Sequence, residues 1–418
     1  MLTQIFQRHQ LTGPLLALDI GTEVIKALVF DIDTDTSARA VVRGVGRVQQ
    51  AVGNMNSGAV SDIGGVITAA RTAIAQAQEN AGVKKAQKAV IGIAGELVKG
   101  TTTTVHYERI NPSLKITMAE LRAIIRKVQQ KAYERIRDQV EWEVGRAVDI
   151  KLINAAIVDV RIDGYRVTNP LDFQGRNVSI SVFNAYAPIV HLGALEEIAR
   201  TLETDLVSVI AEPYAVASAI APEDAMDFSA IFIDIGGGTT DIAVVRGGGL
   251  EGTKMFALGG RAFTKRIMRD MDMDFATAEA LKIRYARGEL SADAATQMEA
   301  LLADDCRVWL DGVELSLSEF AESDPLPAHI YLCGGGSALP GISQVIMQSD
   351  WVQRLAFMGT PQVGFLQPQD VRRVEDATGA LVDPQDVTPM GLVHVAMDLS
   401  REERALTQIL HSAMERVV

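Results

Sequence analysis

The chain has 418 residues, of which 48% are hydrophobic, so it can bury the cores of several domains. Its formal net charge of −13 argues against a nucleic-acid partner. Two cysteines exclude a disulfide framework and a cysteine zinc cluster. We expect no signal peptide and no transmembrane helix, since no apolar run reaches ~18 residues. The Gly-x-x-x-x-Gly-Lys loop of P-loop enzymes does not occur.

Strands and helices alternate through the predicted first half. Residues 15–50 predict a meander of strands. Ser61 is placed to cap a helix that Gly82 ends, and Thr117 with Glu120 forms a capping box at the start of a second helix. The remaining elements are predicted as strands at 90–94, 101–107, 155–162 and 177–184, a helix at 188–203 and a strand at 207–210.

The predicted second half begins with another hairpin, at 231–245. Asp311 and Gly312 have the composition of a tight turn, so residues 308–317 also predict a hairpin. Residues 355–388 show no clear period and predict loops. The other predicted elements are helices ending near 271, at 275–286, 291–303 and 340–347, a strand at 330–333, and a last core helix starting near 388.

One hairpin motif occurs twice. Asp19–Thr22 and Asp234–Thr239 each follow an apolar strand, contain Asp-Ile-Gly, and lead into a second apolar strand. A third glycine group, Gly334–Gly336, ends another predicted buried strand. Two similar hairpins that could face each other, together with a later glycine loop, indicate two related domains that close on one nucleotide.

The residues of these turns suit a triphosphate. Glycine lets backbone N–H groups approach phosphate closely. Thr22 or Thr239 supplies a hydroxyl, and Lys26 supplies a cation. Asp19 and Asp234 would hold Mg²⁺ through water, because Mg²⁺ gives up its waters reluctantly. The alternative interpretation is that each Asp-Ile-Gly is only a hairpin turn.

Together these segments resemble the actin-like ATPase superfamily. Residues 19–26 resemble its first phosphate loop, 234–241 its second phosphate loop, and 330–336 its adenosine loop. Residues 211–217 resemble its first connecting helix. Within the superfamily the sequence is most similar to FtsA, the bacterial cell-division actin homologue. That resemblance covers most of the chain and is carried best by residues 233–244, 278–285 and 333–342.

The resemblance implies a site for ATP and Mg²⁺. Glu212 would orient the attacking water, and Asp19 and Asp234 would hold the metal. Glu279 and Lys282 fall where the superfamily flanks the adenine. The implied nucleotide-binding residues are Gly21, Thr22, Lys26, Gly236, Gly237, Gly238, Thr239, Thr240, Gly260, Glu279, Lys282, Gly334, Gly335 and Gly336.

The implied fold is α/β and actin-like (ribonuclease-H-like), with two domains, the nucleotide in the cleft between them, and an FtsA-type inserted subdomain. The insertion comes early, as in FtsA and the pilus-assembly protein PilM, and in FtsA it serves polymer contacts and partner binding. The implied segments are 1–53 and 185–228 for the first core domain, 54–184 for the inserted subdomain, 229–271 and 329–398 for the second core domain, 272–328 for a small outer subdomain, and 399–418 for a C-terminal amphipathic helix.

The expected function follows from the same resemblance. An FtsA-type protein would polymerise with ATP and link the division machinery, through an FtsZ-like protein, to the inner face of the cytoplasmic membrane. Its ATPase activity would be slow or vestigial. The membrane could be reached through a partner or directly. The candidate direct anchors are the apolar stripe of 399–418, whose polar face is not basic, and the segment 1–8.

Three other functions remain as alternatives. A PilM-like cytoplasmic scaffold of a pilus or secretion platform would share the fold, but its second phosphate loop is usually less rich in glycine. A small-molecule kinase would need a carboxylate base beyond Glu212. A chaperone would need a substrate-binding domain after the ATPase. For residues 54–184, the alternative is an ordinary α+β domain with no binding role.

Overall fold

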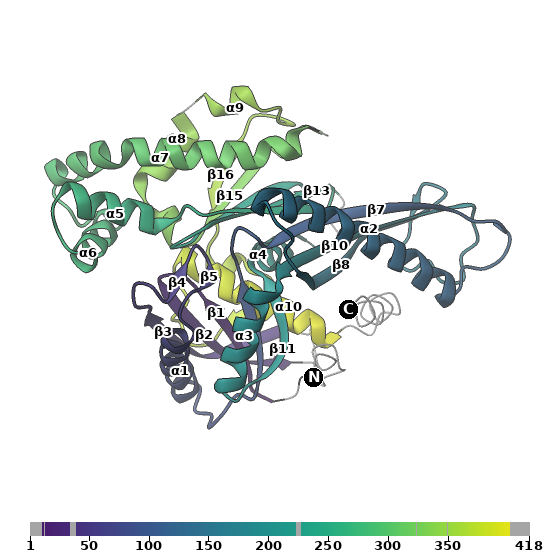
Figure 1. The fold of residues 1–418 in the computed structure, drawn as a ribbon, viewed down its shortest axis with the longest axis horizontal. Coiled ribbons are helices and arrows are strands. Elements are labelled where there is room, and N and C mark those ends of the chain that lie inside the picture. The colour runs from purple at the N-terminus through teal and green to yellow at the C-terminus, as the bar shows by residue number, and fades with distance from the viewer. Residues whose placement is uncertain are drawn as a thin grey trace.

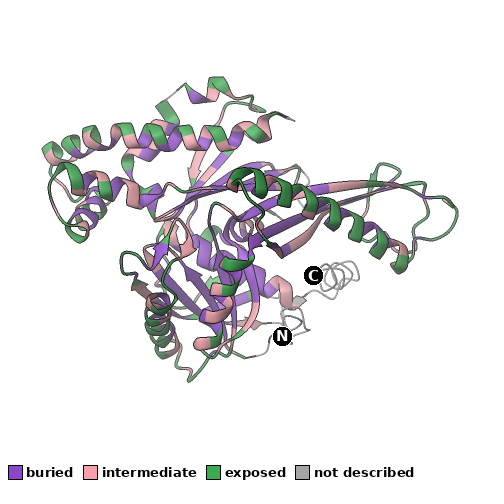
Figure 2. Cartoon of the chain, in the orientation of Figure 1, coloured by how far each residue is buried: buried purple, intermediate pink, exposed green. Residues whose placement is uncertain are grey.

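A computed structural model describes residues 11–401, except 12, 34–38, 223–226, 323 and 349. Two large sheets, of six and nine strands, form its framework (Figure 1). Purple buried residues fill the two sheets, whereas green exposed residues line the outer faces of the helices (Figure 2). No helix in the described part of the chain is long and apolar enough to cross a membrane. The possible anchors at 1–8 and 402–418 lie outside the described residues.

The six-stranded sheet forms the first domain, in the order β11-β6-β1-β2-β3-β17. β1, β2 and β3 pair antiparallel, which confirms the predicted meander, while β6 and β11 extend the sheet in parallel. The bounds are β1 Leu15–Ile20, β2 Val24–Asp33, β3 Arg39–Gln49, β6 Lys88–Ile93, β11 Asp205–Ala211 and β17 Val374–Asp376, with the small ribbon β4 Met55–Asn56 and β5 Ala59–Val60 beside it.

Four helices pack on this domain: α1 (Ile63–Asn80), α3 (Ile189–Thr201), α4 (Glu212–Ile220) and α10 (Val387–Arg401). The cap of α1 is Asp62, whose side chain accepts a hydrogen bond from the N–H of Gly65, so the predicted cap, Ser61, was one residue early. A carboxylate at this position also stabilises the positive end of the helix dipole.

The nine-stranded sheet combines the second domain with part of the insertion, in the order β16-β15-β12-β13-β14-β7-β10-β8-β9. The two parts join where β14 pairs with β7, at Gly252↔Thr101 and Thr253↔Gly100. A Cβ on Gly100 would lie 2.3 Å from the Thr253 hydroxyl, so glycine permits this junction. The second-domain strands are β12 Ala230–Ile235, β13 Thr240–Arg246, β14 Gly249–Phe256, β15 His329–Cys333 and β16 Gln362–Phe365.

The projecting unit, defined here as residues 99–188, extends to the right in Figure 1. Its long helix α2 (Met118–Val144) packs on β7 and β10, and it begins at Thr117, whose side chain accepts from the N–H of Glu120 as the sequence predicts. Gly145 ends the helix in the left-handed conformation. The strands are β7 Lys99–Glu108, β8 Ile150–Ile162, β9 Tyr165–Arg166 and β10 Asn177–Pro188.

The segment 54–184, predicted as one inserted subdomain, is therefore divided between the two sheets. Its first part, through α1 and β6, packs in the first domain, because β6 pairs directly with β1. Only the part from β7 onward forms the projecting unit. The sequence shows both parts as α+β, and only the strand pairing assigns them to different sheets.

The predicted hairpin at 308–317 is wrong. Helix α7 runs unbroken from Ala292 to Ala321, and its buried residues include Cys306, Trp309, Leu310, Val313 and Leu317, a helical spacing. Gly312 is not a turn residue there. A Cβ on Gly312 would lie 2.9 Å from the Phe256 ring, so the glycine lets the helix pack closely on β14.

The remaining helices of the second domain surround this long helix. α5 and α6 lie beside each other and α8 packs against α7 (Figure 1). Their bounds are α5 Gly260–Asp270, α6 Phe275–Ala286, α8 Pro340–Gln348 and α9 Trp351–Arg354.

Candidate nucleotide-binding cleft

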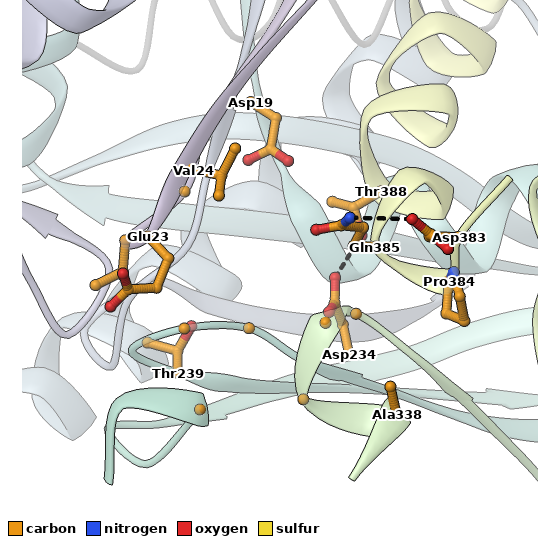
Figure 3. Close-up of a pocket in the computed structure, with 18 of the residues that line it drawn as sticks. Asp19, Glu23, Val24, Asp234, Thr239, Ala338, Asp383, Pro384, Gln385 and Thr388 are labelled. Carbon is orange, nitrogen blue, oxygen red and sulfur yellow. Dashed lines mark hydrogen bonds between the residues drawn. The ribbon is translucent and has the colours of Figure 1, made fainter. Parts of the chain in front are cut away.

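A cavity of about 300 Å³ lies between the two domains, lined by both predicted phosphate loops, the adenosine loop, Glu212 and α6. Figure 3 shows Asp19 of β1 and Asp234 of β12 on opposite sides of it, with Glu23 and Thr239 at the two loops. The cavity gathers the following predicted residues: Asp19, Gly21, Thr22, Lys26, Glu212, Asp234, Gly236, Gly237, Thr239, Gly260, Glu279, Lys282, Gly334, Gly335 and Gly336.

The first hairpin presents a buried ion pair. Asp19 and Lys26 are register partners on β1 and β2, and the Lys26 ammonium lies 3.0 Å from the Asp19 carboxylate. Burial opposes the charged form of Lys26, but Asp19, together with Asp234 and Asp386, more than compensates, so the pKa of Lys26 is raised above its usual value. Lys26 therefore stays protonated at neutral pH and provides a fixed positive charge in the cleft.

The second hairpin presents two carboxylates. Asp234 and Asp241 are register partners on β12 and β13. Burial raises the pKa of both groups, and for Asp241 the negative charge of Asp234 raises it further. Asp234 accepts a hydrogen bond from the hydroxyl of Thr388, whereas one oxygen of Asp241 is buried with no hydrogen-bond partner among the described residues. The unpartnered oxygen of Asp241 can still accept a hydrogen bond from water or bind a cation.

Glu212 lies at the start of α4, directly before Pro213, and is buried. Burial raises its pKa well above the usual value, and Asp19, Asp241 and Asp234 add to the effect. Glu212 has no capping role in the structure, because α4 has no side-chain cap hydrogen bond. The carboxylate instead lines the cavity.

Arg261, the second residue of α5, bridges the two domains over the phosphate loops. Its guanidinium pairs with Glu23 of the first loop, and it donates to the carbonyls of Thr22 at 2.8 Å and Met55 at 3.0 Å. The backbone N–H of Arg261 donates to the Gly237 carbonyl at 2.8 Å. Arg261 therefore contacts both phosphate loops at once and links the two domains.

The part of the cavity beside α6 has a polar wall. Lys282 of α6 lies 2.7 Å from the Glu279 carboxylate, 3.0 Å from the Gly260 carbonyl and 2.8 Å from the Thr264 hydroxyl. These contacts fix both charged side chains before any ligand arrives. The aliphatic side chain of Ile283 lines the same end. The wall combines hydrogen-bonding groups with an apolar surface, as a nucleoside site requires.

The adenosine loop faces this wall. Gly334 has a φ of +82°, and a Cβ there would lie only 2.0 Å from the Asp234 carboxylate. Only glycine fits this position, because another side chain would be strained and would collide with the second hairpin. The third glycine group is thus built against the second phosphate loop.

Two predicted residues do not line the cavity. Thr240 points into the second domain, where its hydroxyl donates to the Leu258 carbonyl and accepts from the indole of Trp309. Gly238 lies at the contact between the two loops, where a Cβ would meet the side chain of Thr22. In the structure both positions shape the second phosphate loop.

Sequence reasoning did not assign site roles to Glu23, Asp241, Arg261 or Thr388. Asp241 was within the predicted second loop, and its pairing with Asp234 could have been inferred from the hairpin register. The contacts of Glu23, Arg261 and Thr388 join segments far apart in the chain, so no local pattern indicates them. The same is true of the cavity residues Asp383, Pro384 and Gln385.

The described residues contain no group of three or more His, Cys, Asp or Glu side chains arranged to hold a metal ion. A direct metal cage is therefore not present in this part of the chain. Carboxylates on both sides of the cleft, with one unpartnered oxygen on Asp241, do fit a metal held through water and phosphate oxygens.

Two sheets that meet at matching hairpins and enclose a glycine-lined cleft define the actin-like α/β fold. The PilM chain of the PilM-PilN type IV pilus biogenesis complex has this fold, and aligns with a TM-score of 0.63 and 18% identity over 93% of this chain and 99% of that one. The actin-like fold is confirmed.

Sequence comparison then shows which known proteins the chain is similar to. A family model described as "Cell division protein FtsA" matches residues 231–391. FtsA of Pseudomonas aeruginosa is 25% identical over 350 residues, covering 78% of each chain. FtsA of Bacillus subtilis is 26% identical over 381 residues, covering 85% of this chain and 80% of the relative. The chain is therefore similar to FtsA over most of its length, as its motifs indicate.

Proposed function

We propose that this chain is an FtsA-like cell-division protein whose cleft binds ATP with Mg²⁺. The observation that carries the proposal is the convergence of two buried lysines and several buried carboxylates on a glycine-lined cavity between two domains. Lys26 would contact phosphate, and the backbone N–H groups of Gly236 and Gly237 would approach it closely. Bound Mg²⁺ would neutralise phosphate charge, held through water by Asp19 and Asp234.

Hydrolysis in this site would be slow. Glu212 is the carboxylate placed to orient a water, since it lines the cavity and has no capping role. Efficient hydrolysis needs accurate placement of that water as well as a base. Burial raises the pKa of Glu212 and so favours its protonated form, which cannot accept a proton; a cation entering the cleft would favour the carboxylate again.

The nucleotide would act mainly by setting the arrangement of the domains. ATP contacts from both phosphate loops would hold the two domains together, in addition to the contacts of Arg261 with the first loop. The projecting unit pairs with β14 of the second domain and is joined through β10 to α3 of the first. A head-to-tail contact that includes this unit would then respond to nucleotide and build an open filament.

The membrane and an FtsZ-like protein are the partners proposed for such a filament. Many weak terminal anchors arrayed along it would bind a membrane by avidity, even if single molecules bind poorly. A PilM-like scaffold role rests on fold likeness alone, and the three successive glycines of the second phosphate loop favour the FtsA-like function.

Electron microscopy on lipid monolayers tests the assembly proposal. We expect filaments with ATP, and none without nucleotide or with the Asp234→Ala variant. Liposome sedimentation of the full chain and of versions lacking 1–10 or 402–418 then identifies the terminal anchor. A chain that binds ATP but never assembles under any of these conditions would contradict the filament function.

A further inference from the structure

The end of the projecting unit farthest from the cleft carries apolar side chains that face solvent. This tip is defined by two loops, residues 109–117 and 163–176. On it Ile110 is 90% exposed, Leu114 60%, Phe173 49% and Tyr165 80%. Single exposed apolar residues are common, but four gathered at one end of a subdomain mark an interaction surface. Green exposed residues dominate this end in Figure 2.

Extensive hydrogen bonding holds the tip in shape. The Ile116 N–H donates to the Phe173 carbonyl at 2.8 Å, and the Gly175 N–H donates to the Pro112 carbonyl at 3.0 Å. The buried Arg109 guanidinium pairs with Glu120 at 2.7 Å and also donates to the Gly175 carbonyl. Because these hydrogen bonds fix the backbone of both loops, the exposed apolar side chains have defined positions on the surface.

A cationic surface adjoins the tip on α2. Its first four turns expose cations that have no ion-pair partner among the described residues: Arg122, Arg126, Lys127 and Lys131. Lys127 also lies over the ring of Tyr107, 5.5 Å from its centroid. The rise of a helix places these four within ~20 Å of the tip loops.

Carboxylates near the tip do not cancel this charge, because they are already paired. Glu120 binds Arg109, Asp172 binds Lys115, and Glu108 lies 3.6 Å from Arg176. Asp163 instead accepts hydrogen bonds from the backbone of Arg176 and Asn177. The region therefore carries an excess of positive charge, in a chain whose formal net charge is −13.

We propose that the tip and the adjoining face of α2 bind an anionic membrane surface. Cations beside exposed apolar and aromatic side chains match a bilayer interface, where lipid head groups attract the cations and the apolar groups enter the boundary with the acyl chains. The projecting end can contact a bilayer without a shape-matched partner (Figure 1). An acidic face of a second copy would instead need a pocket that matches the exposed apolar side chains. The inference rests on the proposed membrane link and deepens it, with residues outside the two terminal segments.

A fluorescent label at the tip tests this contact directly. Cys306 and Cys333 are buried, so a new surface thiol can be labelled selectively. The Ser113→Cys variant carries an environment-sensitive dye on the tip, and Ser61→Cys carries it on the first domain as a matched control. With phosphatidylglycerol vesicles, we expect a blue shift at position 113 only. Phosphatidylcholine vesicles or high salt should abolish it.

Charge reversal measures how much the cationic face contributes. In the full chain, Arg122→Glu with Arg126→Glu should weaken binding to phosphatidylglycerol vesicles about tenfold or more. The matched pair Arg71→Glu and Lys84→Glu, on and after α1, should leave it unchanged. ATP binding, measured on every variant, shows that each one is folded.

Three results would overturn the inference. A silent label at 113 while the chain still sediments with vesicles would assign binding to the terminal segments. A shift on assembly with ATP but without lipid would make a second copy the occupant. Failure to bind vesicles at all would reject the tip as a membrane site, while ATP binding and filament formation would still test the proposed function separately.

Discussion

The β1–β2 and β12–β13 hairpins have the same register, yet they carry different charges at one pair of positions. Asp19 pairs with Lys26 in the first hairpin, and Asp234 pairs with Asp241 in the second. The backbone is repeated, but a lysine in one copy corresponds to an aspartate in the other. The first pair is an ion pair at 3.0 Å, whereas the second pair has raised pKa values.

Because of this difference, the two domains contribute different charged groups to the cleft. The first hairpin supplies a permanent cation, which suits phosphate oxygens. The second hairpin brings two buried carboxylates together, and that arrangement is costly without a proton or a cation. A nucleotide with its metal would satisfy both hairpins at once. The comparison therefore predicts that substitutions in the two hairpins will have different effects.

The largest effect should come from the second hairpin. Asp234→Ala removes the proposed metal anchor, and Gly237→Val adds a side chain where a Cβ would already lie 2.7 Å from Glu23. We expect either variant to lose ATP binding, by about a hundredfold or more. Isothermal titration measures this, with the exposed Asp227→Ala as control. Wild-type affinity in either variant would remove the second phosphate loop from the site.

Glu212→Gln should slow ATP hydrolysis about a hundredfold while leaving ATP affinity intact, because a positioned base typically contributes that much. Phosphate release under single-turnover conditions measures the rate, and titration measures the affinity. The Asp241→Asn variant, which removes a different carboxylate of the same cavity, serves as the comparison. If the Glu212→Gln variant hydrolyses ATP at the wild-type rate, Glu212 has only a structural role.

Lys26→Ala should weaken ATP binding less, by about tenfold, since one charge is lost among several donors. It should also destabilise the nucleotide-free protein by ~3 kcal/mol, because Asp19 is left buried without a partner. Urea denaturation measures the second effect. The double variant Lys26→Met with Asp19→Asn removes both charges and should recover stability but not binding. Recovery of binding as well would show that Lys26 does not contact phosphate.

The second hairpin should also give a pH dependence. Burial raises the pKa of Asp241 above its ordinary 3.8, and raises those of Asp234 and Glu212 as well. The folded, nucleotide-free protein therefore binds more protons than the unfolded chain. Its stability should fall as the pH rises from the ordinary value of 3.8 through the raised pKa values of the folded protein. Asp241→Asn should reduce the slope by up to ~1.4 kcal/mol per pH unit, the contribution of one titrating group. Denaturation at a series of pH values checks the sign, and stability that rises over the same range would contradict it.

The smallest effect should come from the bridge between the hairpins. Arg261→Ala removes three contacts to the first domain but no proposed ligand contact. We expect ATP affinity to fall severalfold, about 1 kcal/mol, because the nucleotide must then close the domains itself. Arg261→Lys should restore part of the loss. Small-angle scattering without nucleotide should show a more open protein, and an unchanged profile would argue against a clamp.

Local chemistry determined much of this protein. The two hairpins were predictable because an apolar strand, Asp-Ile-Gly and a second apolar strand specify a turn within a few residues. The glycines of the adenosine loop stood out at the end of an apolar strand, whereas the role of Glu212 was implied only by the resemblance. The actin-like fold and the relation to FtsA follow from these motifs and their order, and both are confirmed.

Tertiary structure decided the features that depend on contacts between distant parts of the chain. Gly312 lies in a helix because it packs against Phe256, although its neighbour Asp311 made it look like a turn. β7 joins the second-domain sheet through contacts between Gly100 and Thr253, about 150 residues apart in sequence. Arg261 meets Glu23 in the same way. Burial and long-range pairing depend on the whole chain, so the division of the insertion and the closure of the cleft were visible only in the folded structure.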